Sequence, residues 1–283
     1  MREDQQVAQG GTWPAVRMVA ETGSTNDDVR ALALEGAPAA TAVAARIQTA
    51  GRGRRGHGWA SPQGNLYLSV LVRPAVPMQC FMGLSAVCSL GVLRALREDL
   101  HIDAAQLKWP NDVLLGNDGK LAGILVEAGS SSCGLYAVCG VGINVAPDDS
   151  LDPRLFDSPL PLKRACVAQA LPQGVELAVE ELAEVVRRRI LEEVDAWATA
   201  VAAGGALAGP LTPVLGAYTD ALALLGHPVA IIDPAGHPQG TGVFAGVDGW
   251  GRATVCLPDG QAVDYTAEQV SLRPVGDTIQ SVL

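Results

Sequence analysis

The stretch Gln48-Thr-Ala-Gly-Arg-Gly-Arg-Arg-Gly-His-Gly-Trp59 follows an apolar segment, Thr41–Gln48, that is typical of a β-strand. Its glycines let the backbone turn sharply and approach a ligand closely. Its three arginines carry guanidinium groups, which bind phosphate or carboxylate through paired hydrogen bonds and keep their charge. We call residues 51–59 the Gly/Arg loop. It predicts an anion site within a folded domain, and an exposed Arg–Gly loop or a nucleic-acid patch is the alternative. It lacks the Gly-Lys-Ser/Thr ending of a P-loop.

Strands and helices alternate on both sides of this loop. Ser24 or Thr25 begins a short predicted helix that ends near Glu35, with acidic residues in its first turn. Asn65–Arg73 alternates as a strand, and Pro77–Leu100 has the apolar spacing of a long buried helix. The remaining predicted elements are strands at Gln106–Trp109, Val113–Leu115, Leu121–Glu127 and Leu135–Val145 and a helix at Val175–Ala203. Together they predict one large α+β catalytic domain over residues 17–212.

The C-terminal part of the chain has a different pattern. Gly204–Pro213 is rich in Gly and Pro and predicts a linker, and Val214–Leu225 predicts a short helix. Five short strands follow, at Pro228–Asp233, Gly240–Val247, Arg252–Leu257, Gln261–Tyr265 and Val270–Arg273. They predict a small β-barrel domain over residues 213–283. Residues 1–16 are expected to be a flexible lead-in, and Pro147–Pro161 a mobile loop.

Composition excludes several classes of protein. The net charge of −10 argues against general attraction to nucleic acid. The six cysteines form no C-x-x-C pair, which predicts buried free thiols in a reducing compartment, and the four histidines have no zinc-ligand spacing. The N-terminus has no signal-peptide core, and no stretch reaches the roughly 18 uncharged apolar residues of a membrane span. A soluble cytoplasmic protein without a membrane partner is expected.

Further segments carry polar residues where a ligand could bind. Gly23-Ser-Thr-Asn26 stands at a helix start, where it can cap the helix or bind a polar ligand. Lys108-Trp-Pro-Asn-Asp112 ends in an Asn-Asp pair that suits either a turn or a magnesium ion. Lys120 enters an otherwise apolar strand, either at a solvated edge or facing a ligand. Gly142 in an apolar strand indicates a ligand packed against the backbone, with Asn144 at the strand's end.

These segments, in this order, resemble the biotin–protein ligases (biotin–[acetyl-CoA-carboxylase] ligases). The resemblance runs from about Arg17 to Pro274. It implies a mixed sheet flanked by helices, similar to the class II aminoacyl-tRNA synthetase core, with a small C-terminal Src-homology-3-like β-barrel. It also implies the monofunctional type without an N-terminal DNA-binding domain, because the similarity begins near residue 17. A homodimer that does not bind DNA is expected.

The resemblance assigns roles to individual residues. It implies that biotin is bound by Ser24, Thr25, Asn26, Gln48, Gly51, Arg52, Gly53, Arg54, Lys120 and Gly142. It implies that ATP and the adenylate are bound by Arg54, Arg55, Trp59, Asn111, Asp112, Lys120, Asn144 and Arg273. Arg54 and Lys120 are the expected catalytic residues, and Asn111 and Asp112 the candidate Mg²⁺ ligands. His57 stands where a basic residue is more usual, so its role is left open.

The implied reaction has two steps. A biotin carboxylate oxygen attacks the α-phosphorus of ATP and gives biotinyl-5′-AMP, and a lysine of a biotin carboxyl carrier protein then displaces AMP. Two other functions stay open. One is a lipoate– or octanoate–protein ligase, and the other is a non-catalytic nucleic-acid-binding module that uses the arginines of the Gly/Arg loop.

Overall fold

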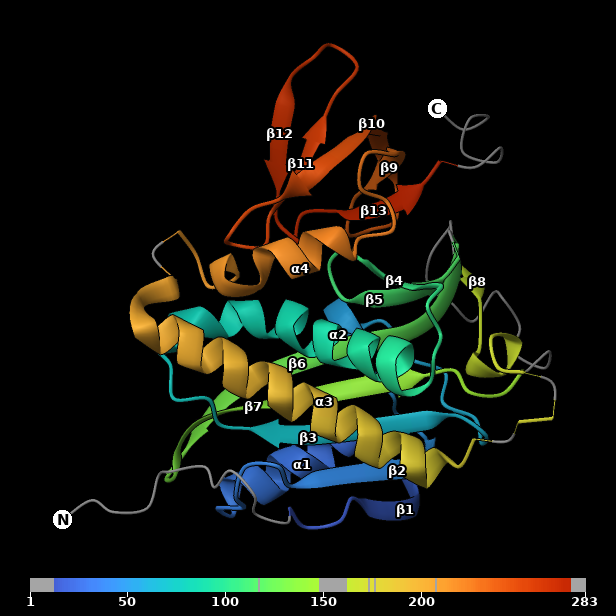
Figure 1. Cartoon of the computed structure of the whole chain (residues 1–283), viewed down its shortest axis with the longest axis vertical. Coiled ribbons are helices and arrows are strands. Elements are labelled where there is room, and N and C mark those ends of the chain that lie inside the picture. The colour runs from blue at the N-terminus through green and yellow to red at the C-terminus, as the bar shows by residue number, and fades with distance from the viewer. Residues whose placement is uncertain are drawn as a thin grey trace.

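The computed structural model describes residues 13–116, 118–147, 162–172, 174–175, 177–206 and 208–275. The predicted mobile loop at 147–161 lies outside these residues except for Pro147, and so does the predicted lead-in at 1–16 except for residues 13–16. Within this part of the chain a mixed sheet is followed by a second, antiparallel sheet (Figure 1).

The first sheet has eight strands within the described ranges, in the order β1-β2-β3-β7-β6-β5-β4, with β8 paired to β6. The strands are β1 (Arg17–Thr22), β2 (Ala42–Gln48), β3 (Leu66–Val72), β4 (Ala105–Lys108), β5 (Asp112–Leu115), β6 (Gly119–Ser131), β7 (Gly134–Ile143) and β8 (Lys163–Arg164). β1 runs parallel to β2, and β8 runs parallel to β6. The other pairs are antiparallel, with Gly123 of β6 opposite Gly142 of β7.

Helices cover both faces of this sheet. α2 (Leu84–Arg94) and α3 (Val179–Ala200) lie across the near face in Figure 1. α1 (Thr25–Leu34) packs on the opposite face, where Val29 and Ala33 meet Leu71 and Val138. Side chains alternate between the two faces of a strand. Because helices cover both faces of the sheet, every residue of β3 is buried. The face that carries α1 also carries the site described below.

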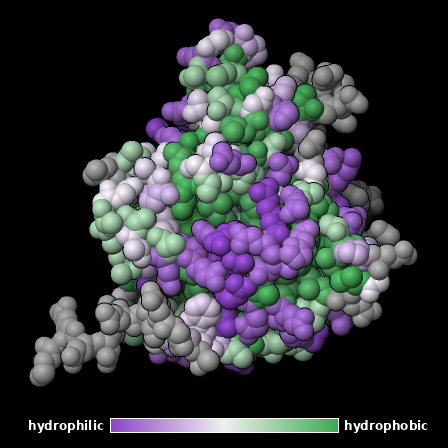
Figure 2. All heavy atoms as spheres, viewed as in Figure 1, coloured by the Kyte–Doolittle hydropathy of each residue, from purple (hydrophilic) through white to green (hydrophobic). Residues whose placement is uncertain are grey.

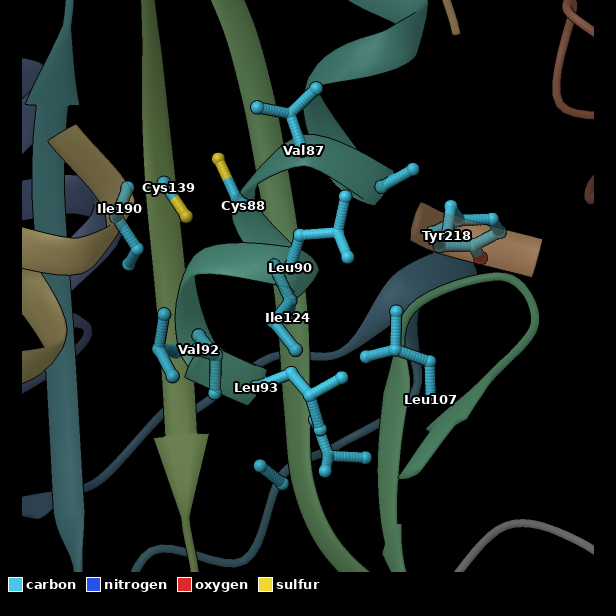
Figure 3. Close-up of a cluster of buried hydrophobic side chains, with 14 of the residues drawn as sticks. Val87, Cys88, Leu90, Val92, Leu93, Leu107, Ile124, Cys139, Ile190 and Tyr218 are labelled. Carbon is cyan, nitrogen blue, oxygen red and sulfur yellow. The ribbon is translucent and has the colours of Figure 1, made fainter. Parts of the chain in front are cut away.

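The pair α2–α3 packs closely because of a glycine. A Cβ atom at Gly91 would lie 2.7 Å from the Cα atom of Ile190, so only glycine permits this separation. Figure 3 shows Ile190 beside the core formed by α2 and the sheet, with Cys88 and Cys139 inside it. The outer side of α3 is charged (Figure 2) and is joined to the turn after α2 (Ala95–Asp99) by ion pairs such as Arg189–Asp99 at 2.7 Å.

The predicted helix at Pro77–Leu100 is confirmed, with irregular ends. A 3₁₀ segment (Met78–Gly83) precedes α2, and a π-helical turn (Ala95–Asp99) follows it. The expectation that no stretch reaches the length of a membrane span is wrong, because length and composition alone would allow Met78–Asp99 to cross one. Its most apolar window is 72% buried within the protein, as a core helix would be.

The second sheet contains the five predicted C-terminal strands, in the order β12-β11-β10-β9-β13. They are β9 (Pro228–Ile232), β10 (Pro238–Val247), β11 (Ala253–Cys256), β12 (Ala262–Tyr265) and β13 (Ser271–Pro274). All their pairings are antiparallel. Within the described part of the chain β12 and β13 are its edges, so an antiparallel sheet is confirmed and barrel closure stays a prediction.

Backbone contacts between β4 and the segment that follows α4 explain why the sequence misplaced the end of a helix. The predicted helix at Val214–Leu225 is shorter, α4 (Leu215–Asp220). Beyond it the chain extends beside β4. The Leu107 amide donates to the Ala221 carbonyl at 2.8 Å, and the Ala223 amide donates to the Leu107 carbonyl at 2.8 Å. This pairing replaces the helical hydrogen bonds. Strands β1 and β8 were not predicted either.

The cysteines are all free thiols. Cys88, Cys139 and Cys166 are buried, as the sequence predicts, and Cys80 is half-buried. The prediction is wrong for Cys133 and Cys256, which are exposed. Cys133 lies in the turn between β6 and β7, and Cys256 ends β11 at the surface.

Candidate functional site

A cavity of about 260 Å³ opens between the start of α1, the Gly/Arg loop, strands β6 and β7, and the C-terminal sheet. Every predicted site residue except Gly51 lines it: Ser24, Thr25, Asn26, Gln48, Arg52, Gly53, Arg54, Arg55, Trp59, Asn111, Asp112, Lys120, Gly142, Asn144 and Arg273. A Cβ atom at Gly51 would lie 2.5 Å from Ser61 Oγ and 2.6 Å from the Trp59 carbonyl oxygen. Gly51 therefore allows the loop to close on itself.

One end of the cavity is a neutral hydrogen-bonded network. The Thr25 amide and hydroxyl donate to Gln48 Oε1 at 2.9 and 3.1 Å. Gln48 Nε2 in turn donates to Ser61 Oγ at 3.1 Å. The fully buried hydroxyl of Ser69 lies 2.7 Å from Thr25 Oγ1 and 2.6 Å from Asn26 Oδ1. These side chains fix one another before any ligand binds.

The start of α1 carries a serine that does not act as an ordinary cap. Ser24 occupies the N-cap position of α1, yet its side chain makes no capping hydrogen bond. It is 5% exposed and lines the cavity. Of the two readings of the Gly23–Asn26 segment, this geometry favours a hydroxyl that faces a ligand.

Three glycines on β6 and β7 form the floor of the cavity and seat two of its side chains. A Cβ atom at Gly140 would overlap the Asn26 amide. A Cβ atom at Gly142 would lie 2.5 Å from the Trp59 ring, and one at Gly123 2.7 Å from it. The sequence predicts a ligand against Gly142. This prediction is corrected: the Trp59 ring packs against Gly142, so the glycine makes room for this side chain. Gly142 still lines the cavity.

The other end of the cavity concentrates positive charge around one carboxylate. Lys120 Nζ lies 2.7 Å from Asp112 Oδ1, and Lys108 Nζ lies 3.4 Å from Asp112 Oδ2. Lys120 also lies over the Trp59 ring, with 5.0 Å from Nζ to the ring centroid. Arg273 lines the same cavity and is close enough to influence both Lys108 and Asp112 electrostatically. Three cations thus share one anion.

Burial and neighbouring charges shift the protonation equilibria of this cluster. Burial, reinforced by Arg273 and Lys120 and opposed by Asp112, lowers the pKa of Lys108 to about 7. Burial alone would raise the pKa of Asp112, but Lys120 and Lys108 outweigh it and hold that pKa below its usual range. Burial also lowers the pKa of Arg273. Such an excess of partly desolvated positive charge is unfavourable until an anion joins it.

The arginines of the Gly/Arg loop are held by protein groups. Arg52 makes two hydrogen bonds to the Asp27 carboxylate, at 2.6 and 2.8 Å, which hold the pKa of Asp27 below its usual range. Arg54 pairs with Glu268 at 2.6 Å. Arg55, with a φ of 57°, donates to the carbonyl oxygens of Ala267 and Val270. The loop is therefore docked on the segment between β12 and β13, and the predicted phosphate contacts of Arg54 and Arg55 stay predictions.

The two predicted asparagines brace strand β6. Asn111 Nδ2 donates to the Ile124 carbonyl at 2.6 Å, and Asn144 Nδ2 donates to the Lys120 carbonyl at 3.0 Å. Both bonds fix the backbone that carries Lys120.

The predicted magnesium site does not fit this geometry. Both carboxylate oxygens of Asp112 already contact an ammonium group. Within the described ranges, no three His, Cys, Asp or Glu side chains gather where they could hold a metal ion. Metal ligation by Asn111 and Asp112 therefore stays a prediction without support from these contacts.

Sequence reasoning missed several functional positions. Ser69 is a polar residue on a strand that is otherwise apolar except for Tyr67, and this pattern could have revealed it. Glu127 accepts a 2.6 Å hydrogen bond from Asn26 Nδ2 and lies 3.8 Å from Arg52. No pattern in the sequence shows that pairing, because 101 positions separate Glu127 from Asn26. Lys108 was part of a recognised motif but was given no role.

The shifted pKa of Lys108 predicts how stability depends on pH. Between about pH 7 and the ordinary lysine value of about 10.4, the unfolded chain keeps a proton that the folded chain has lost. The free energy of unfolding should therefore rise with pH in this window, by up to about 1.4 kcal/mol per unit. The check is urea unfolding at several pH values. Lys108→Met should remove this component of the slope, and equal slopes in both proteins would contradict it.

Comparison with known proteins identifies the family of this chain. The model of the biotin/lipoate A/B protein ligase family matches residues 20–144. A biotin–[acetyl-CoA-carboxylase] ligase of Paracoccus denitrificans is 36% identical over 89% of this chain and 98% of its own length. One of Mycobacterium tuberculosis is 43% identical over 53% of this chain and 57% of its own length. The structure of the Aquifex aeolicus biotin protein ligase in complex with biotin and ATP superposes with a TM-score of 0.71, at 25% identity, over 93% of this chain and 100% of that chain. The chain therefore belongs to the family of biotin–[acetyl-CoA-carboxylase] ligases.

Proposed function

We propose that this protein activates biotin with ATP and transfers it to a lysine of a biotin carboxyl carrier protein. One observation carries the proposal. A single cavity joins a neutral hydrogen-bonding end, at Thr25 and Gln48, to a cationic end, at Lys120 and Lys108. The ureido group of biotin is neutral and polar, and the phosphates of ATP are anionic, so the two ends match the two substrates.

The order of contacts supports a proposed position for each substrate. Biotin takes the end lined by Ser24, Thr25 and Asn26, with Trp59 and the glycine floor beside it. Its carboxylate then points toward Lys120, because Lys120 lies over the Trp59 ring and next to Gly123. ATP occupies the cationic end. The reacting carboxylate and the α-phosphate therefore meet at Lys120.

The chemistry follows from this placement. A carboxylate oxygen of biotin forms a bond to the α-phosphorus of ATP, and the bond to the bridging oxygen breaks, so pyrophosphate leaves with the electron pair. The acceptor amine next attacks the acyl carbon, and AMP leaves. Neither step needs a protein nucleophile. The ammonium group of Lys120 stabilises the negative charge at the reacting phosphate, and the fixed network positions the acid.

The nearest rival is a lipoate– or octanoate–protein ligase, because the matched family model covers both kinds. The test is labelling of a biotin carboxyl carrier domain with labelled biotin and MgATP in the presence of excess lipoate. Unlabelled biotin should abolish the label, and lipoate should leave it unchanged. Competition by lipoate with equal potency would reject biotin as the preferred acid. The nucleic-acid alternative finds no support in Arg52, Arg54 and Arg55, since all three are engaged by protein groups.

Further proposals concern assembly and surroundings. We propose that the C-terminal sheet belongs to a Src-homology-3-like barrel, and that the protein is a cytoplasmic homodimer that does not bind DNA. An edge strand supports a dimer: in the described part of the chain β1 pairs only with β2 and leaves its other side open. Mg²⁺ is proposed to arrive with ATP as the counter-ion of its phosphates.

A further inference from the structure

Glu127 on β6 is a carboxylate outside the cavity that contacts two residues lining it. Its Oε2 atom accepts a hydrogen bond from Asn26 Nδ2 at 2.6 Å, and Arg52 Nη2 lies 3.8 Å from the same oxygen. Asn26 and Arg52 line the cavity, whereas Glu127 does not. The reaction described above gives Glu127 no part.

Arg52 depends less on Glu127 than Asn26 does. Asp27 holds the Arg52 guanidinium group through two hydrogen bonds, at 2.6 and 2.8 Å, which are much shorter than the contact between Arg52 and Glu127. The 2.6 Å hydrogen bond with Asn26 is therefore the main contact of Glu127. An effect of Glu127 on the cavity is expected to pass through Asn26.

The charge of Glu127 decides how the Asn26 amide is oriented. An ionised carboxylate can only accept hydrogen bonds, so it faces the NH₂ group of the amide. The amide oxygen is thereby directed to the other side, where Ser69 Oγ lies 2.6 Å from it. Asn26 is buried, and a Cβ atom at Gly140 would overlap its amide. The confined amide can differ only in which of its two ends faces Glu127.

The orientation of Asn26 determines where the Ser69 hydroxyl proton goes. Ser69 is fully buried and has one proton for two neighbouring oxygens, Asn26 Oδ1 at 2.6 Å and Thr25 Oγ1 at 2.7 Å. With its oxygen toward Ser69, Asn26 draws that proton away from Thr25. With the amide reversed, the proton would be directed wholly at Thr25 Oγ1.

Thr25 is the member of this network whose hydroxyl faces the ligand. It lines the cavity, and its own proton goes to Gln48 Oε1 at 3.1 Å. Toward the cavity Thr25 therefore offers lone pairs, which suit a ligand with an N–H donor. A ureido group carries N–H donors, whereas the alkyl chain of octanoate and the dithiolane ring of lipoate carry none. A ligand without such a donor leaves a buried acceptor unpaired, which is costly.

We propose that Glu127 is a positioning residue that makes the neutral end of the cavity selective for an acid with an N–H donor. It acts through Asn26 and Ser69 and touches neither substrate. By holding the Asn26 oxygen toward Ser69, it keeps the Ser69 proton from occupying the lone pairs that Thr25 offers to the ligand. This inference rests on the proposed function and deepens it, because it traces the choice of acid to one carboxylate outside the cavity.

The test measures binding of the acid alone, by calorimetric titration of the whole protein without ATP. The probes are biotin and its two cyclic carbamate analogues, in each of which one ureido N–H group is replaced by oxygen. Glu127→Ala and Glu127→Val remove the acceptor, and valine favours a strand. Glu127→Gln keeps an amide oxygen that can accept from Asn26.

Two further variants serve as comparisons. Asp27→Asn weakens the hold on Arg52 and leaves Asn26 and Ser69 unchanged. Glu180→Ala is the matched control, since Glu180 is 48% exposed, lies outside the cavity and pairs only with Arg46 in the described part of the chain. The free energy of unfolding is measured for every variant.

The wild type should bind biotin at least roughly ten-fold more tightly than one of the carbamate analogues, the usual size of one well-made hydrogen bond. Glu127→Ala and Glu127→Val should reduce that preference to about two-fold or less. Glu127→Gln, Asp27→Asn and Glu180→Ala should keep it. General disruption would weaken all three ligands equally, so the preference distinguishes positioning from structural damage.

A second measurement tests the route through Ser69. In a Ser69→Ala background the hydroxyl that links Asn26 to Thr25 is missing, so adding Glu127→Ala should not change the preference further. A further loss of preference in this double variant would contradict the route.

Several results would overturn the proposal. One is an unchanged preference in a folded Glu127→Ala or Glu127→Val variant. Another is an equal loss of preference in Asp27→Asn, which would trace the effect to Arg52. A third is a Glu127→Gln variant that behaves as Glu127→Ala. A wild type that does not bind biotin would instead refute the proposed function, whereas a biotin-binding wild type with unaffected Glu127 variants would refute only the role of Glu127.

Discussion

Replacing Lys120 with alanine is expected to slow formation of biotinyl-5′-AMP by roughly 10²–10³-fold, the usual effect of removing one preorganised group that stabilises transition-state charge. Lys120 is the cation positioned between the Trp59 ring and the Asp112 carboxylate. Its backbone is fixed by the side chain of Asn144, so the ammonium group approaches the phosphate in a defined position. Single-turnover measurement with labelled ATP gives the rate of this step directly.

Two controls separate chemistry from folding in that experiment. Lys120→Ala leaves Asp112 Oδ1 without its short ion pair, so the free energy of unfolding must be measured alongside the rate. Lys163→Ala removes an exposed lysine near the start of β6 and should leave the rate unchanged. If Lys120→Ala retains the wild-type single-turnover rate, the placement of the α-phosphate at this residue is wrong.

Replacing Gly140 with alanine is expected to raise the KM for biotin by roughly 10–100-fold, the range that follows from losing one well-made buried hydrogen-bonding contact. The new methyl group would overlap the amide of Asn26, which is held between Ser69 and Glu127. Asn26 must then move, and the network at the neutral end loses its geometry. The KM for ATP should change much less, because the cationic end does not contact Gly140.

The matched control for this substitution is another strand glycine. A Cβ atom at Gly246 of β10 would meet nothing within 4 Å. Gly246→Ala should therefore leave both KM values unchanged, while Gly140→Ala should also lower stability by about 1–3 kcal/mol through overpacking. Equal increases in both KM values for Gly140→Ala would show general disruption and not a specific loss of the acid site.

Much of the architecture could be predicted from the sequence because local patterns determine it. The apolar spacing of Pro77–Leu100 and the period-two pattern of Asn65–Arg73 both correspond to observed elements. The five C-terminal strands were found from their turn residues. Strand β1 was missed because its sequence, Arg-Met-Val-Ala-Glu-Thr, mixes polar and apolar residues at an edge. The end of α4 was misplaced because pairing with Leu107, more than a hundred residues earlier, overrides local helix preference.

The candidate site was predicted in outline, but its internal contacts were not. Residue types and the family resemblance brought Lys120, Asp112 and Trp59 to one cavity. They could not show that Asp112 holds two lysines or that Trp59 occupies the glycine floor. Such contacts depend on the register of β6 against β7 and on the packing of the C-terminal sheet. Neither leaves a local signature in the sequence.

We expect one cavity to make the adenylate and to hold it until an amine arrives. The most direct test is a pulse–chase experiment with the wild type. The protein is incubated with labelled biotin and MgATP, separated from free ligands, and then mixed with a biotin carboxyl carrier domain without ATP. We expect protein-bound biotinyl-5′-AMP after the pulse and its transfer to the carrier lysine, with release of AMP, during the chase. A protein that retains no labelled adenylate, or a carrier that stays unlabelled unless ATP is added again, would contradict the account.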